Sequence, residues 1–487
     1  MPSGTQVGGP QSPRDAGGRA RLSISQLWGV AAVGLSAGFV SLQPLGAVDL
    51  AYLVRAGEEM LDRGGVLRTD VMLTWTLGNG WLNQQWGFEL LVAIAFRGVG
   101  WLGLAAVRGT LVASVLGLVY LGCRRAGAGR RTSALLTVGS LLLLAPGVQL
   151  RSQLAGMVCF AAVLWLVEGR REHPGRLAWA PLVVLVWANL HGSFFLGPLL
   201  LGFAWLEDRN HRCPDWRRTL FVTAASVVAT AITPFGLDTW RYVADVAGDP
   251  LVRDVVSEWQ APTLRLLPGA AFIVSLALML LLVGRRSGPM DRVAAGRLLV
   301  FAALGLASFR GTLWWTLLAP ITAARWLPEV RDGAPDPRGR VNGAIAAALV
   351  LFSLSSMALW LPHANREAPG SWVTYAPHGI TRELEGLLRP GERFFHPQQW
   401  GSWFELALQQ NPASVDSRFE LIPPRRWREY AAVSAGRADW GQILDSWGVR
   451  ILVLSPEKQA ELIPIALEDP DWRLVYEDDD GMVLTRT

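Results

Sequence analysis

The sequence predicts an α-helical polytopic membrane protein that ends in a small α/β part. Hydrophobic residues make up 51% of the 487-residue chain, charged residues make up 17%, and the mean hydropathy is +0.28. Apolar runs long enough to cross a bilayer, which takes about 20 residues, recur up to residue 361. Beyond that point the apolar runs shorten to strand length and alternate with helix-like segments.

The placement of arginine predicts the orientation of the spans. Nearly all of the positive charge is arginine, and it gathers in every second loop, for example at Arg124, Arg170 and Arg285. Because arginine-rich loops stay in the cytoplasm, the N-terminus is expected inside and the C-terminal part outside. About eleven spans are expected, near residues 27–46, 101–122, 132–149, 154–168, 177–191, 193–206, 219–235, 267–284, 293–309, 312–327 and 342–361.

The chain divides into three predicted parts. Residues 1–26 are rich in Gly, Ser, Pro and Arg and are expected to form a disordered cytoplasmic tail. Residues 27–361 form the transmembrane part, with a large first outer loop over residues 47–100. Residues 362–487 form an extracytoplasmic α/β part of mixed sheet type. Its strands are expected at 450–454, 472–476 and 482–484, and its helices at 425–433 and 457–467.

The first outer loop carries two predicted surface helices. Apolar residues recur at helical spacing between Leu50 and Leu61, with charged residues opposite, and Gly64-Gly65 ends this helix. A second surface helix is expected from Trp86 to Phe96. Asp49 opens the loop just past the first span, and a carboxylate held at the membrane surface by a folded loop is a candidate catalytic base.

Several classes of function find no support in the chain. It has no phosphate loop, paired-histidine zinc helix, nucleophile elbow or dinucleotide fingerprint. The arginines lie in short loops and not on one basic face, so no nucleic-acid partner is expected. The cysteines, Cys123, Cys159 and Cys213, have no spacing typical of a disulfide framework or a metal knuckle.

Polar residues gather at the outer ends of the predicted spans. A charge near the bilayer centre costs about 3 kcal/mol or more, so such groups tend to line a wet cavity. Their position at one depth and on one side indicates a single site. The candidate catalytic residues are Asp49 and Asp70. The candidate substrate-binding residues are Trp86, Glu89, Arg151, Gln153, Asn189, His191, Glu258, Trp259 and Arg310.

A series of segments has a specific order and spacing along most of the chain. The segments are Asp49–Leu53 with Gly57, Arg68–Asp70 with Thr74, Trp81–Glu89, Arg151–Gln153, Trp187–Gly192, Thr233–Gly236, Ser257–Pro262, Trp400-Gly401 and Val415–Arg418. The series resembles a bacterial family of polytopic membrane proteins related to the GT-C glycosyltransferases. Ala51-Tyr52-Leu53 stands where relatives often have Trp-Trp-His, and Gln85 stands where they often have an acid. Both departures count against a metal site in this loop.

The resemblance implies a GT-C glycosyltransferase of the mannosyl- or arabinosyltransferase kind. Such an enzyme moves a sugar from a polyprenyl-phosphate donor to an envelope glycan, lipid or protein on the outer face of the bacterial inner membrane. By its match to the first-loop acid of the family, Asp49 is the expected base of a single inverting displacement. Arg151 and Arg310 are the expected phosphate ligands, because a guanidinium binds two oxygens at once. No cofactor is certain, and a divalent cation stays open.

The same residues also have structural interpretations. Asp49 precedes a helix and is a possible N-cap, and Asp70 suits a turn. Glu89 suits a solvated surface helix, and Arg151 and Arg310 can extend to lipid headgroups. His191 suits a buried, hydrogen-bonded position. Most tryptophans of the first loop are expected to anchor the chain at the membrane interface.

Two other functions remain open at this stage. A transporter or flippase of a lipid-linked solute would carry charges in both halves of the bilayer, and Arg108 in the second span is one such charge. A non-catalytic assembly protein would use its outer α/β part to recruit an envelope partner. Because most ionisable groups lie at span ends, the sequence favours chemistry at the membrane surface.

Overall fold

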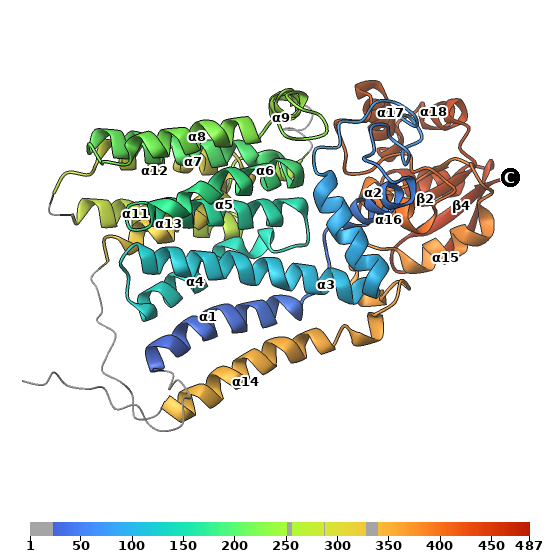
Figure 1. The fold of residues 1–487 in the computed structure, drawn as a ribbon. Helices are drawn as coiled ribbons and strands as arrows, with labels where there is room; N and C mark the ends of the chain where they lie inside the picture. The colour runs from blue at the N-terminus through green and yellow to red at the C-terminus, as the bar shows by residue number, and fades with distance from the viewer. Residues whose placement is uncertain (1–22, 251–255, 287, 328–338) are drawn as a thin grey trace, which may run out of the picture.

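The computed structural model describes residues 23–250, 256–286, 288–327 and 339–487. Figure 1 shows a bundle of roughly aligned helices and, at one end of it, a part that contains the β-sheet. Of the tail expected over residues 1–26, residues 1–22 lie outside the described residues. The prediction is wrong for its last residues, because Ser23 and Gln26 form a capping box and the first helix begins at Ile24.

Each expected span overlaps a helix of the bundle. Four of these helices, α1, α3, α11 and α14, are long and apolar enough to cross a membrane by length and composition. The total number of spans therefore stays a prediction. The bundle helices are α1 (Ile24–Ser41), α3 (Trp86–Arg125), α4 (Arg130–Leu144), α5 (Ser152–Glu168), α6 (Ala180–Leu190), α7 (Leu196–Asn210), α8 (Trp216–Ala229), α11 (Leu267–Gly284), α12 (Arg292–Ala307), α13 (Phe309–Ala324) and α14 (Gly339–Ala358).

Helix α3 contains a break that separates the predicted second surface helix from the predicted second span. Val99 and Gly100 have non-helical backbone angles, and Gly100 has φ 56°. A Cβ atom on Gly100 would lie 1.7 Å from the carbonyl oxygen of Asn365, so no larger residue fits this contact. The segment from Trp86 to the break leaves the bundle and packs beside the C-terminal part (Figure 1).

Arg108 has a structural explanation in the bundle. Its side chain is buried, and its Nη1 and Nη2 donate to the carbonyl oxygens of Pro44 and Gln43, just past the end of α1. A cation at the carboxyl end of a helix satisfies carbonyls that lack a partner within the helix. The intramembrane charge expected of a transporter is therefore engaged in joining α1 to α3.

The C-terminal part contains a four-stranded mixed sheet in the order β1-β2-β4-β3. Strand β1 runs parallel to β2, and the other neighbours are antiparallel. Three strands lie where the sequence predicts them. The elements are β1 (Phe394–Phe395), β2 (Ile451–Leu454), β3 (Trp472–Glu477), β4 (Met482–Arg486), α15 (His378–Leu387), α16 (Gln398–Ala407), α17 (Pro424–Ser434), α18 (Trp440–Trp447) and α19 (Leu462–Glu468).

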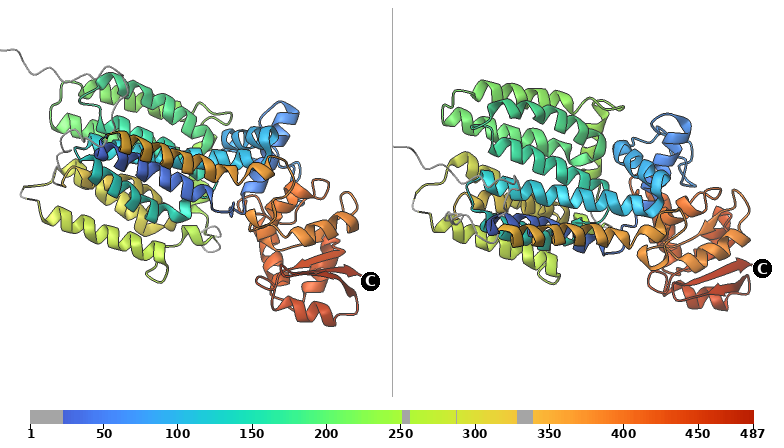
Figure 2. Two further views of the ribbon diagram at one scale, coloured as in Figure 1. Left: turned by 90° about the horizontal axis from the view of Figure 1, so that it is seen from below. Right: turned by 60° about the horizontal axis from the view of Figure 1, so that its bottom comes forward.

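The first outer loop and the C-terminal part share one hydrophobic core. Helix α2 (Leu50–Arg63) packs between α3 and α16, and its apolar face is buried by protein. The prediction that this helix rests its apolar face on the membrane is therefore wrong. Gly57 makes the packing possible, because a Cβ there would lie 2.1 Å from the carbonyl oxygen of Glu89. Figure 2 shows the loop and the C-terminal part together at one end of the bundle.

Two tryptophans of the first loop fix it to the C-terminal part. The ring of Trp75 lies 4.7 Å from that of Trp447, and the guanidinium of Arg426 lies 4.4 Å from the centre of the Trp75 ring. Trp81 is 4% exposed and contacts the guanidinium of Arg418. These side chains are used within the protein and not as anchors at the membrane interface.

Candidate active site

Four charged side chains of alternating sign form a row at the end of the bundle next to the C-terminal part. Arg151 Nε donates to Asp49 Oδ2 at 2.8 Å, and Arg151 Nη1 donates to Glu258 Oε1. Arg310 Nε donates to Glu258 Oε2 at 2.9 Å. We call Asp49, Arg151, Glu258 and Arg310 the charged row. Sequence reasoning had placed all four in one site, and the structure brings them into contact.

Each member of the charged row is held by the end of a helix. Asp49 precedes α2 and Arg151 precedes α5, whereas Arg310 lies in the first turn of α13. Glu258 belongs to the short 3-10 helix η4 (Ser257–Trp259). The backbone N–H of Phe309 donates to the Gln260 carbonyl at 2.8 Å, which fixes η4 against α13. Because each side chain lies at the end of a helix, the four side chains can converge in the space between the helix ends.

Asp49 occupies the N-cap position of α2, but a residue of α16 does the capping. Within the described part of the chain, the Asp49 side chain makes no capping hydrogen bond. The backbone N–H of Tyr52 instead donates to Ser402 Oγ at 2.8 Å. Ser402 thus satisfies a free donor of the first turn and leaves the Asp49 carboxylate for Arg151.

Asp49 keeps one carboxylate oxygen free. Its Oδ1 atom is buried and has no hydrogen-bond partner among the described residues. A buried oxygen without a donor is unusual in a folded protein and indicates a missing partner such as a substrate hydroxyl. Asp49 Oδ1 can therefore accept a hydrogen bond from a further group.

Glu258 is an ionised bridge and has no free oxygen. Burial alone would raise its pKa, but the charges of Arg151 and Arg310 and the hydrogen bonds from both lower it below its usual value. Because each of its oxygens accepts from an arginine, Glu258 holds the two guanidinium groups at a fixed separation. Arg310 also lies over the ring of Trp259, 5.5 Å from its centre.

Hydroxyl and amide groups continue the polar surface beside Asp49. Ser152 Oγ donates to Gln85 Oε1 at 2.6 Å, and Gln85 Nε2 donates to the Tyr52 hydroxyl. Gln85 thus acts as a neutral bridge between Ser152 and Tyr52. Gln153 follows Ser152 and is 7% exposed.

Asn189, Trp86 and His191 lie at the edge of the charged row. Trp86 Nε1 donates to Asn189 Oδ1 at 2.9 Å, and Asn189 Nδ2 donates to two backbone carbonyls, so Asn189 mainly joins helices. His191 Nδ1 lies 2.7 Å from Ser193 Oγ and is close enough to Arg310 to interact with its charge.

Asp70 and Glu89 lie apart from the charged row. Asp70 is fully buried and accepts from the backbone of Met72 and Leu73, from Thr76 Oγ1 at 2.6 Å, and from Arg418 at 3.1 Å. Glu89, also fully buried, accepts from the Asn83 amide and is not the solvated side chain expected of a surface helix. The contacts of Asp70 fix the loop to the C-terminal part.

Two residues next to the charged row were missed by sequence reasoning. Tyr242, in α9 (Asp238–Gly248), donates from its hydroxyl to Glu420 Oε1 at 2.7 Å. Burial raises the pKa of Glu420 although the hydrogen bond from Tyr242 lowers it. The partners are 178 residues apart, so no local pattern connects them.

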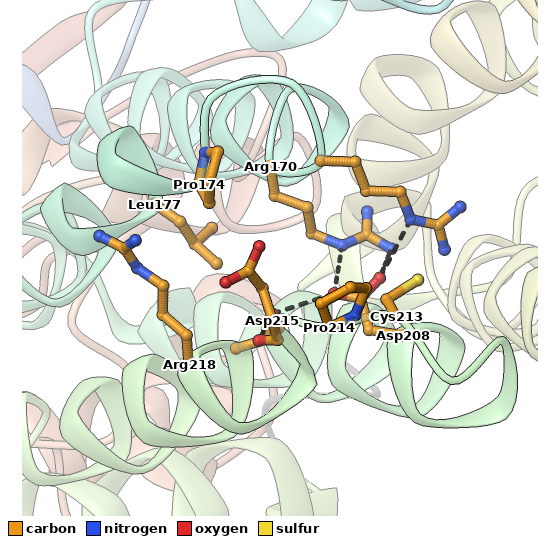
Figure 3. Close-up of a pocket in the computed structure, with 10 residues that line it drawn as sticks. Arg170, Pro174, Leu177, Asp208, Cys213, Pro214, Asp215 and Arg218 are labelled. Carbon is orange, nitrogen blue, oxygen red and sulfur yellow. Dashed lines mark hydrogen bonds and ion pairs between the residues drawn. The ribbon is translucent and has the colours of Figure 1, made fainter.

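The opposite end of the bundle holds a separate ionic pocket (Figure 3). Arg170 and Arg171 both bond Asp208, which also accepts from Thr219 Oγ1 at 2.9 Å. Its cavity of about 150 Å³ is smaller than the usual range for ligand pockets. Helix α5 separates Arg151 from Arg170, by about 28 Å at 1.5 Å per residue. We assign this pocket to the packing of α5, α7 and α8.

The described residues offer no ligand set for the divalent cation that the sequence left open. Across residues 23–250, 256–286, 288–327 and 339–487, no three His, Cys, Asp or Glu side chains are grouped so as to hold a metal ion.

Comparison with solved structures identifies the architecture. An oligosaccharyltransferase from Archaeoglobus fulgidus in the apo form matches with a TM-score of 0.53 and 11% identity, over 95% of this chain and 75% of that one. The arabinofuranosyltransferase AftD from Mycobacteria matches with a TM-score of 0.56 and 15% identity, over 96% of this chain and 40% of that one. The chain has the GT-C fold.

A third match supports the same architecture over nearly the whole of both chains. ArnT from Cupriavidus metallidurans matches with a TM-score of 0.51 and 14% identity, over 94% of this chain and 97% of that one. No family model and no curated protein sequence matches the chain. The predicted GT-C-like architecture is confirmed, and the protein is a membrane protein.

Proposed function

We propose that the protein is an integral-membrane glycosyltransferase that moves a sugar from a polyprenyl-phosphate donor to an envelope acceptor. The observation that carries the proposal is the charged row, in which a carboxylate with one free oxygen contacts Arg151, and Arg151 shares Glu258 with Arg310. The GT-C fold supports it, and the oligosaccharyltransferase AglB from Archaeoglobus fulgidus has been solved with an inhibitory peptide and a dolichol-phosphate (TM-score 0.50, 12% identity).

In this reaction Asp49 acts as the general base. Its free Oδ1 takes the proton of an acceptor hydroxyl, and the hydroxyl oxygen attacks the anomeric carbon of the donor. The bond between that carbon and the phosphate oxygen breaks, and the electron pair leaves with the polyprenyl phosphate. Because both oxygens of Glu258 are engaged by arginines, Glu258 is not free to act as a nucleophile. A single displacement with inversion follows.

Arg310 receives the departing phosphate. Its Nε donates to Glu258. Among the described residues, none accepts a hydrogen bond from its Nη1 or Nη2. The planar guanidinium can therefore present two donors to phosphate oxygens, and Arg151 adds positive charge. Glu258 keeps both arginines in place between turnovers.

The location of the reaction follows from the predicted topology. With arginine-rich loops in the cytoplasm, the end of the bundle that carries the charged row faces the outside of the bacterial inner membrane. The acceptor is then an envelope glycan, lipid or protein. The ionic pocket around Asp208 lies on the cytoplasmic side in this orientation.

A comparison of glycolipids, glycans and glycoproteins by mass spectrometry tests the proposal. A strain lacking the gene is complemented with the native protein, with Asp49→Asn, or with Asp62→Asn as a control on an exposed carboxylate of α2, all at equal membrane levels. We expect one sugar increment that is restored by the native and Asp62→Asn proteins and not by Asp49→Asn. Identical profiles in all strains would refute glycosyl transfer, and full rescue by Asp49→Asn would refute the assignment of the base.

A further inference from the structure

A second pocket, in the C-terminal part, is large enough for a ligand. It has a volume of about 650 Å³, within the usual range for small-molecule sites, and lies between α17, the start of α16 and the segment before α19. We call it the C-terminal pocket. Residues that line it include Gln399, Phe419, Trp427, Tyr430, Ser434 and Gln459.

The C-terminal pocket combines aromatic rings with polar atoms that lack partners. Phe419 and Trp427 stack with their centres 4.9 Å apart and 12° between their planes. Trp427 Nε1 and Gln459 Nε2 are buried and unpartnered among the described residues, and these side chains are 7% and 1% exposed. Buried polar groups are normally hydrogen-bonded, so these donors indicate a ligand that supplies acceptors.

The hydroxyl groups in the pocket extend this pattern. Tyr430 Oη accepts from the backbone N–H of Gln398 at 2.7 Å, and the Gln459 side chain lies beside the same hydroxyl. Ser434 Oγ lies next to this hydroxyl but makes no hydrogen bond of normal geometry within the described chain. The pocket thus presents donors and acceptors in alternation beside an aromatic surface.

The charges around the C-terminal pocket cancel. Lys458 is paired with Glu457 at 2.7 Å. Arg428 and Glu461, which also line the pocket, carry opposite charges. A phosphate-rich ligand would require an excess of positive charge, which this rim does not offer. A neutral ligand with many hydroxyl groups and an apolar face, which describes a sugar ring, matches both the rim and the interior.

The C-terminal pocket adjoins the candidate active site through the backbone. Phe419 lines the pocket, and the next residue, Glu420, accepts the hydrogen bond from Tyr242. The side chain of Val243, the next residue of α9, lies against Gly192, which follows His191 in the chain. A chain of sugars seated in the pocket would therefore lead toward the charged row.

We propose that the C-terminal pocket binds neutral sugar residues of the acceptor, so that the acceptor of the proposed transfer is a glycan. This inference rests on the proposed function for the role of the ligand, but the binding itself does not depend on transfer. Phe419 packs against a sugar face, while Trp427 Nε1 and the Gln459 amide donate to its oxygens.

Binding of neutral trisaccharides to the full chain in nanodiscs, without any donor, tests the inference. Mannotriose, galactotriose and arabinotriose are titrated up to about 10 mM and observed by saturation-transfer difference NMR. Phe419→Ala removes the partly buried ring, and Trp427→Phe removes one donor but keeps a ring. Arg425→Ala, on an 80% exposed side chain of the same helix, is the control.

We expect saturable binding of at least one trisaccharide, weakened about tenfold by Phe419→Ala and about fivefold by Trp427→Phe, and unchanged by Arg425→Ala. Equal unfolding temperatures would show that the variants are folded. Absence of binding by all three trisaccharides, or equal binding by all variants, would overturn the inference. Binding of a control hexapeptide or of pyrophosphate in their place would overturn it as well. A protein that binds a trisaccharide but does not transfer a sugar contradicts only the proposed function.

Discussion

Replacing Glu405 with glutamine should remove a pH dependence from the stability of the protein. Arg418 contacts three carboxylates, at 3.1 Å to Asp70 and 2.7 Å to Glu405, with Asp416 as the third. All four side chains are at most 2% exposed. Burial raises the pKa of Glu405 and of Asp416 by more than Arg418 lowers them. We assign the proton that this group retains to Glu405, because burial raises the pKa of Glu405 well above its usual value.

The sign of the effect follows from the raised pKa. A carboxyl that binds its proton more tightly in the folded state stabilises the protein fully below its unfolded pKa, which is about 4.3 for Glu. This contribution is lost as the pH rises toward the folded pKa, by up to about 1.4 kcal/mol per pH unit, or about 2.7 kcal/mol over two units. Glutamine carries no charge and still offers its oxygen to Arg418, so Glu405→Gln should flatten this part of the curve.

Intrinsic tryptophan fluorescence during heating measures the effect in nanodiscs between about pH 5 and 9. The native protein should lose stability toward high pH more steeply than Glu405→Gln. Glu457→Gln, on a 72% exposed side chain, should follow the native curve. Parallel curves for the native protein and Glu405→Gln would refute the assignment of the proton, because a fully ionised cluster has no proton to lose.

Three further predictions concern the site and its support. Asp49→Asn should lower the transfer rate by about 10² to 10⁴ with little change in unfolding temperature, and a rate within threefold of native would contradict its role as base. Arg310→Lys should lower kcat for transfer about tenfold and kcat/KM for the donor by at least as much, as steady-state kinetics would show, because lysine cannot bind two oxygens of the departing phosphate at once. Gly57→Ala should lower the free energy of unfolding by about 2 kcal/mol or more, because its Cβ would overlap the backbone of Glu89. Gly65→Ala faces open space and should lower it less, and thermal unfolding measures both variants.

The regular elements could be predicted from the sequence because their signals are local. The apolar face from Leu50 to Leu61 gives α2, and Gly64 ends it with φ 68°. The short apolar runs at β2, β3 and β4 give strands at the expected places. Strand β1 is two residues long and was not predicted, because so short a segment carries no periodic signal.

The candidate site could be predicted only in part, because its contacts join distant segments. Arg151, Glu258 and Arg310 were chosen as polar groups at span ends, and their pairing with Asp49 required the fold. The capping of α2 by Ser402 joins residues 350 apart in the chain. The sequence offered an N-cap interpretation for Asp49 because the local pattern is the same whether or not another helix supplies the cap.

The shared core of the first outer loop and the C-terminal part has a consequence for biosynthesis. Asp70 meets Arg418 across 348 residues, which a ribosome adds in roughly 20 to 70 s at 5 to 20 residues per second. During that interval the loop is already outside the membrane in the predicted topology, with its apolar helix uncovered and Asp49 not yet positioned. A nascent or prematurely ended chain therefore exposes apolar surface to chaperones and proteases outside the membrane. Completion of translation becomes the event that assembles the charged row, so fragments of the protein should be cleared before they can accumulate in the membrane.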